Sequence, residues 1–256
     1  MVENETPPSV RPLVHLIAGP TGVGKSAAAT DLARATGAPI VVADRLQCFT
    51  DLATTSARAG ADVPGVRRHW LGDRTFTEGD LSANQAADAL VELVQLLAVQ
   101  HRLVIIEGGS ISLLRVLCAR PARLDWRLTV RLLTLPEYDT YLAALTHRAR
   151  SMLTPGVCGP GLLQELAALW RDPGKRRLAA SVNGFEAVLE CCAKYSIDAE
   201  TVDDGEIPEH ILRRMAALIA VRHAEHGILQ HRVFTEIFAN GTTVSAFDFG
   251  QLERAA

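Results

Sequence analysis

Short apolar runs alternate with longer segments of helical periodicity in the first half of the chain. Helix formers extend from Lys25 to Arg34, and apolar residues recur on one helical face over 84–99. Buried β-strands are predicted by nearly continuous apolar runs, at 13–18, 40–43, 103–106 and 128–133. This alternation predicts an α/β fold in which a parallel sheet is covered by helices on both faces.

Strand patterns nearly disappear after Pro136, which is positioned to open a helix. Apolar residues at helical spacing over 185–192 and 211–219 predict that the second half is mainly helical. We therefore divide the chain into a disordered tail at 1–12, an α/β core at 13–135, a mainly helical substrate-binding part at 136–238 packed on the core, and a tail at 239–256.

Composition narrows the class of protein. The 256 residues carry 26 Lys and Arg against 29 Asp and Glu, and 48% are hydrophobic. This balance is typical of a globular domain, and it argues against a protein whose main task is to grip a nucleic-acid backbone. The sequence shows neither a signal peptide nor an apolar segment long enough to span a membrane, and its scattered cysteines form no CxxC pair. We expect a cytoplasmic protein without a membrane partner.

The segment Gly19-Pro20-Thr21-Gly22-Val23-Gly24-Lys25-Ser26 matches the phosphate-loop pattern G-x-x-x-x-G-K-[ST]. It directly follows a predicted strand and opens a predicted helix, as the mechanism requires. The glycines allow backbone N–H groups to surround an anion, and the helix N-terminus adds partial positive charge. Lys25 is placed to reach an outer phosphate, and the Ser26 hydroxyl is placed to hold Mg²⁺. Only three of the basic residues are lysines, which makes an incidental Lys25 less credible.

A phosphate loop indicates a polyphosphate ligand without saying which one. A nucleotide-driven switch, a small-molecule kinase using ATP, an enzyme that holds another diphosphate and a non-catalytic nucleotide-binding protein all remain open. The chain lacks the Asn-Lys-x-Asp motif of GTPases, and Glu107 is the candidate carboxylate after an apolar strand. Asp44 also follows a strand, at the sheet edge where α/β proteins bind ligands, although aspartates there often only cap turns.

Further motifs follow the phosphate loop in a specific order: ADRLQC at 43–48, FTEG at 76–79 and EGGSISLL at 107–114. With this combination the chain, from about Leu13 to Arg232, resembles the isopentenyltransferases of cytokinin biosynthesis, the adenylate dimethylallyltransferases of plant-associated bacteria. The related tRNA-modifying isopentenyltransferases usually read Asp-Ser-x-Gln at 44–47, where this chain has Asp-Arg-Leu-Gln. They typically also carry tRNA-binding segments that are not found in this sequence, so tRNA prenylation is the alternative within the resemblance.

The resemblance implies transfer of a dimethylallyl group from its diphosphate to the exocyclic amine of AMP, with Mg²⁺ and without a nucleic-acid partner. Asp44 would be the base and would bind AMP together with Ser56. Thr21 would bond the departing bridging oxygen. The leaving diphosphate would be held by Arg148, from the following helical part, and by residues of the phosphate loop. These loop residues are Gly19, Gly22, Val23, Gly24, Lys25 and Ser26.

The resemblance also implies a prenyl pocket that contains Asn183 and His226. Family members with Asp and His at these places accept a hydroxylated donor, 1-hydroxy-2-methyl-2-butenyl 4-diphosphate, besides the dimethylallyl one. Asn183 keeps the hydrogen-bonding capacity but lacks the charge, so the preference between the donors stays open. His223 and His226 are spaced like metal ligands on a helix, but no third ligand is evident. The loop at 154–161 departs from its relatives in having no charged residue.

Overall fold

The computed structural model describes residues 11–58, 60–61, 63–120, 126–156 and 159–239. The predicted tails therefore lie almost entirely outside the described residues. At the centre of the described part is a five-stranded sheet with the order β3-β2-β4-β1-β5. All its pairs are parallel. The strands are β1 (Leu13–Ala18), β2 (Ile40–Val42), β3 (Arg68–Trp70), β4 (Leu103–Gly108) and β5 (Arg127–Leu132).

The parallel sheet is confirmed, and the strand at its edge is an addition to the prediction. β3 has only three residues, all of them half-buried. So short a segment carries too little apolar periodicity to be distinguished from a loop. It pairs with β2 in the register Ile40–Arg68 and Val42–Trp70, and it brings Arg68 into the interior.

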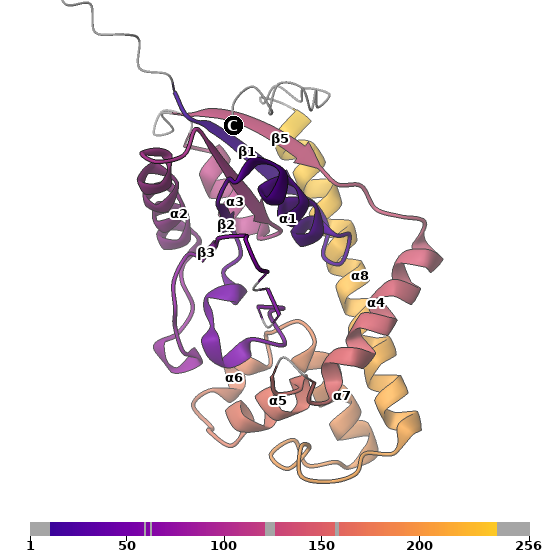
Figure 1. The fold of residues 1–256 in the computed structure, drawn as a ribbon. Coiled ribbons are helices and arrows are strands. Elements are labelled where there is room, and N and C mark those ends of the chain that lie inside the picture. Colours follow the sequence, from indigo (N-terminus) through magenta and orange to yellow (C-terminus); the bar gives the residue numbers. More distant parts are fainter. Residues whose placement is uncertain (1–10, 59, 62, 121–125, 157–158, 240–256) are drawn as a thin grey trace, which may run out of the picture.

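Helices cover both faces of the sheet, as predicted (Figure 1). On one face α1 (Lys25–Thr36) packs Ala29, Leu32 and Ala33 against strand side chains. The other face is covered by α2 (Ala83–Ala98), by α3 (Ile111–Cys118) and by the end of α8 (Glu209–Ala239). Apolar side chains of the central strands alternate between these two cores, which is why the strands read as continuous apolar runs.

The remaining helices build a further core, the helical core, beside the carboxyl ends of the strands. They are α4 (Tyr138–Leu153), α5 (Leu162–Trp170), α6 (Arg176–Ala179) and α7 (Phe185–Tyr195). The short 3₁₀ segments η1 (Leu46–Cys48), η2 (Thr50–Leu52) and η3 (Phe76–Glu78) add Phe49, Leu52 and Phe76 to this core. The prediction of a mainly helical second half is confirmed.

One helix, α8, connects the helical core to the sheet. α8 has 31 residues, and in Figure 1 it runs from beside α7, along α4, to the sheet. Its first half packs Met215 and Ile219 into the helical core, and its last turns pack Phe234 and Phe238 against the sheet. Side chains near its middle can therefore reach the space between the helical core and the sheet. No helix among the described residues is long and apolar enough to cross a membrane.

Candidate active site

A cavity of about 750 Å³ lies between the carboxyl ends of the strands and the helical core. Its wall is built from the phosphate loop, from the segments that follow β2 and β4, and from side chains of α4 and α8. The predicted site residues on this wall are Thr21, Gly22, Gly24, Lys25, Ser26, Asp44, Ser56, Arg148, Asn183 and His226. Gly19 and Val23 belong to the loop but do not line the cavity. The fold thus brings groups from distant parts of the chain to one space.

The loop has the backbone geometry of an anion site. Gly22 and Gly24 have φ angles of +75° and +91°, in the left-handed region that favours glycine. A Cβ on Gly22 would also lie only 2.6 Å from Cδ2 of Leu145. α1 begins at Lys25 and has no acidic residue in its first turn, so its positive N-terminal end faces the loop uncompensated.

Lys25 is a half-buried cation whose proton is weakly held. Its Nζ donates to the carbonyl of Pro20 at 2.5 Å. Burial lowers the pKa of Lys25 to about 8; the negative charge of Asp44 opposes this change and the positive charge of Arg148 adds to it. An anion bound in the loop would stabilise the charged form of Lys25.

Asp44 is the carboxylate opposite this cation. One of its oxygens accepts from the N–H of Leu46 at 2.9 Å. Burial raises the pKa of Asp44, and the Leu46 N–H, Lys25 and other neighbours only partly offset the rise. A carboxylate with a raised pKa in a cavity has the properties of a general base.

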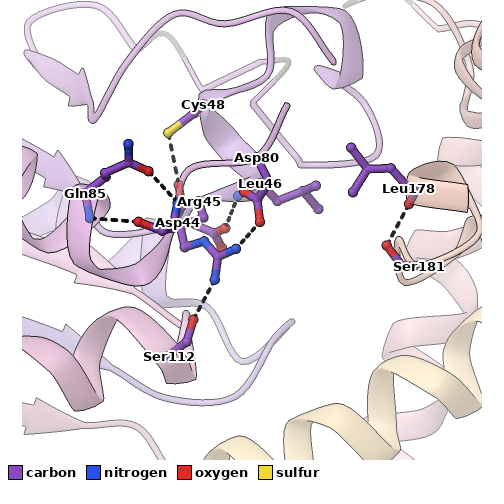
Figure 2. Close-up of polar contacts among 10 residues, drawn as sticks. Asp44, Arg45, Leu46, Cys48, Asp80, Gln85, Ser112, Leu178 and Ser181 are labelled. Atoms are coloured by element: carbon purple, nitrogen blue, oxygen red, sulfur yellow. Dashed lines mark hydrogen bonds and ion pairs between the residues drawn. The ribbon is translucent and has the colours of Figure 1, made fainter. Parts of the chain in front are cut away.

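Arg45 follows Asp44 but is held on a different part of the wall. Figure 2 shows its guanidinium between Asp80 and Ser112. It forms an ion pair with Asp80 and donates to Oγ of Ser112 at 2.8 Å. The figure also shows Leu178, from the helical core, across the space from Leu46. The Asp-Arg-Leu-Gln segment therefore lines the cavity and is fixed to α3 and to the residues before α2.

Ser56 lines the cavity, and its hydroxyl oxygen is buried and unpaired among the described residues. The residue as a whole is 7% exposed. Glu165 on α5 fixes the preceding residues, because its carboxylate accepts from the N–H of Thr54 at 2.7 Å and from the N–H and hydroxyl of Thr55 at 2.8 and 2.6 Å. Sequence reasoning missed Glu165; a single acid within the apolar stretch LLQELAALW was the available signal.

The described residues of the uncharged loop at 154–161 contact the segment that precedes Ser56. The hydroxyl of Thr54 donates to the carbonyl of Pro160 at 2.5 Å. Gly156 and Gly159 form a β-bridge. The described residues of this loop thus support the backbone that carries Ser56 and bring no charge to the cavity.

Arg148 and His223 form a second polar group on the helical side of the cavity. Arg148, on α4, is half-buried, and burial lowers its pKa. Burial, with added repulsion from Arg148 and His226, lowers the pKa of His223 to about 4. His223 is therefore neutral at neutral pH, which leaves Arg148 as the charged group of this pair.

The predicted prenyl-pocket residues lie on the same wall. Asn183, just before α7, and His226, on α8, line the cavity with Met152, Leu178 and Val182. Burial lowers the pKa of His226, while Asp44 opposes the change. Across the described residues, no group of three or more His, Cys, Asp or Glu side chains could hold a metal ion, so His223 and His226 have no such partner.

Glu107, near the carboxyl end of β4, is already paired. It forms an ion pair with Arg68 of β3, and each side chain is only 5% exposed. Arg68 also donates to the hydroxyl of Thr30 at 3.0 Å. The strand that was not predicted thus supplies the cation that neutralises Glu107 beneath the cavity.

Sequence reasoning also missed the side chains that hold the phosphate loop. The hydroxyl of Tyr141 donates to the carbonyl of Thr21 at 2.7 Å, and the side-chain oxygen of Gln230 accepts from the N–H of Thr21 at 2.7 Å. No local motif connects these residues, which are 120 and 209 positions away from Thr21. Only the packing of α4 and α8 beside the loop reveals them.

The chain is similar in sequence and structure to several known proteins. An adenylate dimethylallyltransferase of Rhodococcoides fascians is 38% identical over 234 residues, which cover 91% of this chain and 92% of the relative. One of Agrobacterium fabrum is 33% identical over 226 residues, with 88% and 92% covered. The full-length tRNA isopentenylpyrophosphate transferase of Bacillus halodurans has a similar structure, with a TM-score of 0.67, 15% identity and coverage of 96% and 98%; at that identity the likeness shows the fold alone.

The family model described as isopentenyl transferase matches residues 12–244. This match spans the phosphate loop, the sheet and the helical core, and the two curated relatives cover nearly the same length. The chain belongs to the isopentenyl transferase family.

Proposed function

We propose that this chain transfers a dimethylallyl group from its diphosphate to the exocyclic amine of AMP, the first step of cytokinin biosynthesis. The proposal rests on one cavity that holds both a phosphate loop with Lys25 and a half-buried carboxylate, Asp44, whose pKa is raised. Such a transfer needs a cationic site for the leaving diphosphate and a base for the amine proton. The names of the relatives from Rhodococcoides and Agrobacterium support the same reaction.

In this proposal the phosphate loop holds the leaving group rather than ATP. Lys25, Arg148 and the loop amides stabilise the negative charge that develops on the leaving diphosphate. The Thr21 hydroxyl bonds the bridging oxygen as the carbon–oxygen bond breaks. These donors stabilise the transition state most, because they are already in place when the charge develops.

The proposed reaction uses Mg²⁺, and the hydroxyl of Ser26 would bind the ion. Ser26 lines the cavity at the start of α1. The described residues provide no cluster of carboxylate or imidazole ligands. This fits an ion that is bound mainly by substrate phosphate oxygens, by water and by one hydroxyl, as Mg²⁺ prefers. When bound, the ion would neutralise charge on the diphosphate.

Asp44 and Ser56 serve the acceptor in this proposal. As the new bond forms between the amine nitrogen and the allylic carbon, the nitrogen loses a proton to the Asp44 carboxylate. The hydroxyl of Ser56, which is unpaired among the described residues, would bond AMP. The prenyl chain would lie against Met152, Leu178 and Val182, with Asn183 and His226 as the polar groups of the pocket.

An acceptor panel tests the proposed function. The purified chain is incubated with dimethylallyl diphosphate, Mg²⁺ and, in separate reactions, AMP, ADP, ATP or an unmodified tRNA, and product masses are recorded. We expect prenyl-AMP to form fastest. Prenylated tRNA without prenyl-AMP would favour tRNA as the substrate, and phosphate transfer from ATP without any prenyl product would favour a kinase; either result would contradict the proposal.

A further inference from the structure

One buried side chain connects three parts of the site without lying among the proposed reacting groups. Gln230, on α8, is 4% exposed, and both ends of its amide are hydrogen-bonded. Its Oε1 accepts from the N–H of Thr21 at 2.7 Å, and its Nε2 donates to the carbonyl of Gly109 at 2.6 Å. The phosphate loop, the turn after β4 and the long helix are therefore joined at a single residue.

Thr21 is also held on its other side. The hydroxyl of Tyr141, a residue of α4 that is 2% exposed, donates to the Thr21 carbonyl at 2.7 Å. Gly227 on α8 leaves the space for that hydroxyl, since a Cβ there would collide with it. Both backbone polar groups of Thr21 are thus bonded by side chains from outside the loop, which fixes the peptide planes on either side of it.

The same contact places the glycine turn against the catalytic lysine. A Cβ on Gly109 would lie 2.7 Å from Nε2 of Gln230 and 3.4 Å from Nζ of Lys25. The turn therefore sits closely against both side chains. Without the Gln230 amide, the N–H of Thr21 and the carbonyl of Gly109 would lose these bonds in a partly buried setting, and such groups move until they find new partners.

We propose that Gln230 is a positioning residue for departure of the diphosphate, and that Tyr141 acts on the same loop residue. The proposal rests on the proposed function. The two side chains set the position of Thr21 relative to Lys25 before the donor binds. Donors placed in advance stabilise the transition state more than the bound substrate. Loss of Gln230 should therefore lower kcat more than it raises KM.

The variant Gln230→Met keeps the length of the side chain and removes both hydrogen bonds. We expect kcat to fall about 10- to 100-fold, the size of effect that a small misplacement of reacting groups produces, with little change in KM for AMP. Gln164→Met is the matched control, because Gln164 accepts only from the N–H of Gly161 at 3.2 Å, at the start of α5. The control should keep wild-type kcat. A wild-type kcat in Gln230→Met, or an equal loss in both variants, would overturn the proposal.

A double variant tests whether the two side chains act through Thr21. Tyr141→Phe removes only the hydroxyl bond and should also lower kcat. Because both bonds orient the same residue, we expect the double variant with Gln230→Met to lose much less than the product of the two single losses. Fully multiplicative losses would show independent actions and would overturn the shared role.

Amide hydrogen exchange measured by NMR, without any substrate, gives a readout that is independent of activity. The N–H of Thr21 should be protected in the wild type and in Gln164→Met and should exchange faster in Gln230→Met, while amides of β1 stay protected and show that the fold persists. Unchanged protection of Thr21 would overturn the proposal. If the wild type makes no prenyl-AMP, the proposed function fails, and this exchange result still decides whether Gln230 positions the loop.

Discussion

At the residue scale, the same cavity alters the pKa of one cation, Lys25, and of one carboxylate, Asp44. Burial weakens the hold of Lys25 on its proton and raises the proton affinity of Asp44. Each charge stabilises the other, because a cation favours the ionised carboxylate and a carboxylate favours the protonated amine. The sequence located both residues, but their altered pKa values depend on packing from α4 and α8.

Replacing Asp44 by asparagine tests the base. Asp44→Asn keeps the shape and the acceptor for the Leu46 N–H but cannot take a proton. We expect kcat to fall about 10²- to 10⁴-fold, the usual contribution of a general base, with pyrophosphate affinity retained. Asp73→Asn is the matched control, because Asp73 is an exposed partner of Arg58 away from the cavity wall. Wild-type turnover in Asp44→Asn, measured by prenyl-AMP formation, would remove Asp44 as the base.

The pH dependence of kcat/KM for the prenyl donor should be bell-shaped. As the pH rises through about 8, free Lys25 loses its proton and the site loses a cation, so the rate should fall on the alkaline side. As the pH falls, Asp44 becomes protonated at a pH above the ordinary range for aspartate, because its pKa is raised, and the base is lost.

Lys25→Arg tests whether Lys25 causes the alkaline fall of kcat/KM, because a guanidinium stays protonated throughout this pH range. The variant should be slower, and its rate should not fall near pH 8. An unchanged alkaline limb in Lys25→Arg would show that a different group titrates there.

The donor preference should respond to one residue. Asn183→Asp introduces a carboxylate on the wall of the cavity that His226 also lines, and a charged acceptor bonds a hydroxyl more strongly than an amide does. We expect the ratio of kcat/KM for the hydroxylated donor to that for the plain donor to rise about 3- to 30-fold, since a hydrogen bond to a charged group contributes roughly 1 kcal/mol more. An unchanged ratio in a competition assay would show that Asn183 does not contact the prenyl chain.

At the element scale, the sequence predicted the strands that have a recognisable apolar pattern. β1 and β4 are nearly continuous apolar runs, β2 is short but wholly apolar, and β5 alternates apolar with polar residues, while α1 follows from the phosphate-loop motif. β3 could not be predicted, because its three half-buried residues fit a loop equally well. α8 was recognised only in part: its apolar face changes partners from α7 to the sheet along its length, so no single periodic pattern describes it.

The ion pair that β3 contributes should be important for stability. Arg68→Met leaves the Glu107 carboxylate buried without its partner, and breaking a buried pair in this way costs about 3–5 kcal/mol of unfolding free energy. Urea unfolding followed by circular dichroism measures the change. Arg67→Met, at the exposed neighbouring position, is the control and should be close to wild type. Equal stabilities of the two variants would show that the pair does not hold the sheet edge.

At the scale of the whole molecule, the candidate active site lies where the helical core meets the carboxyl ends of the strands. Motifs located the groups that a phosphate or an amine would contact, because those groups lie in short local segments. The supports for those segments come from elsewhere: Gln230 and Tyr141 hold the phosphate loop, and Glu165 holds the segment with Ser56. Such contacts depend on how helices distant in sequence pack together, and no local pattern encodes them.

The central claim is that a carbon–nitrogen bond forms between the prenyl donor and AMP in this cavity. The most direct measurement uses a dimethylallyl diphosphate labelled with ¹³C at the reacting carbon and AMP labelled with ¹⁵N at the exocyclic amine, followed by NMR of the product. We expect a direct coupling between the two labels and release of an equal amount of diphosphate. An intact donor beside phosphorylated AMP, or label that appears only on tRNA when both acceptors are present, would contradict this claim.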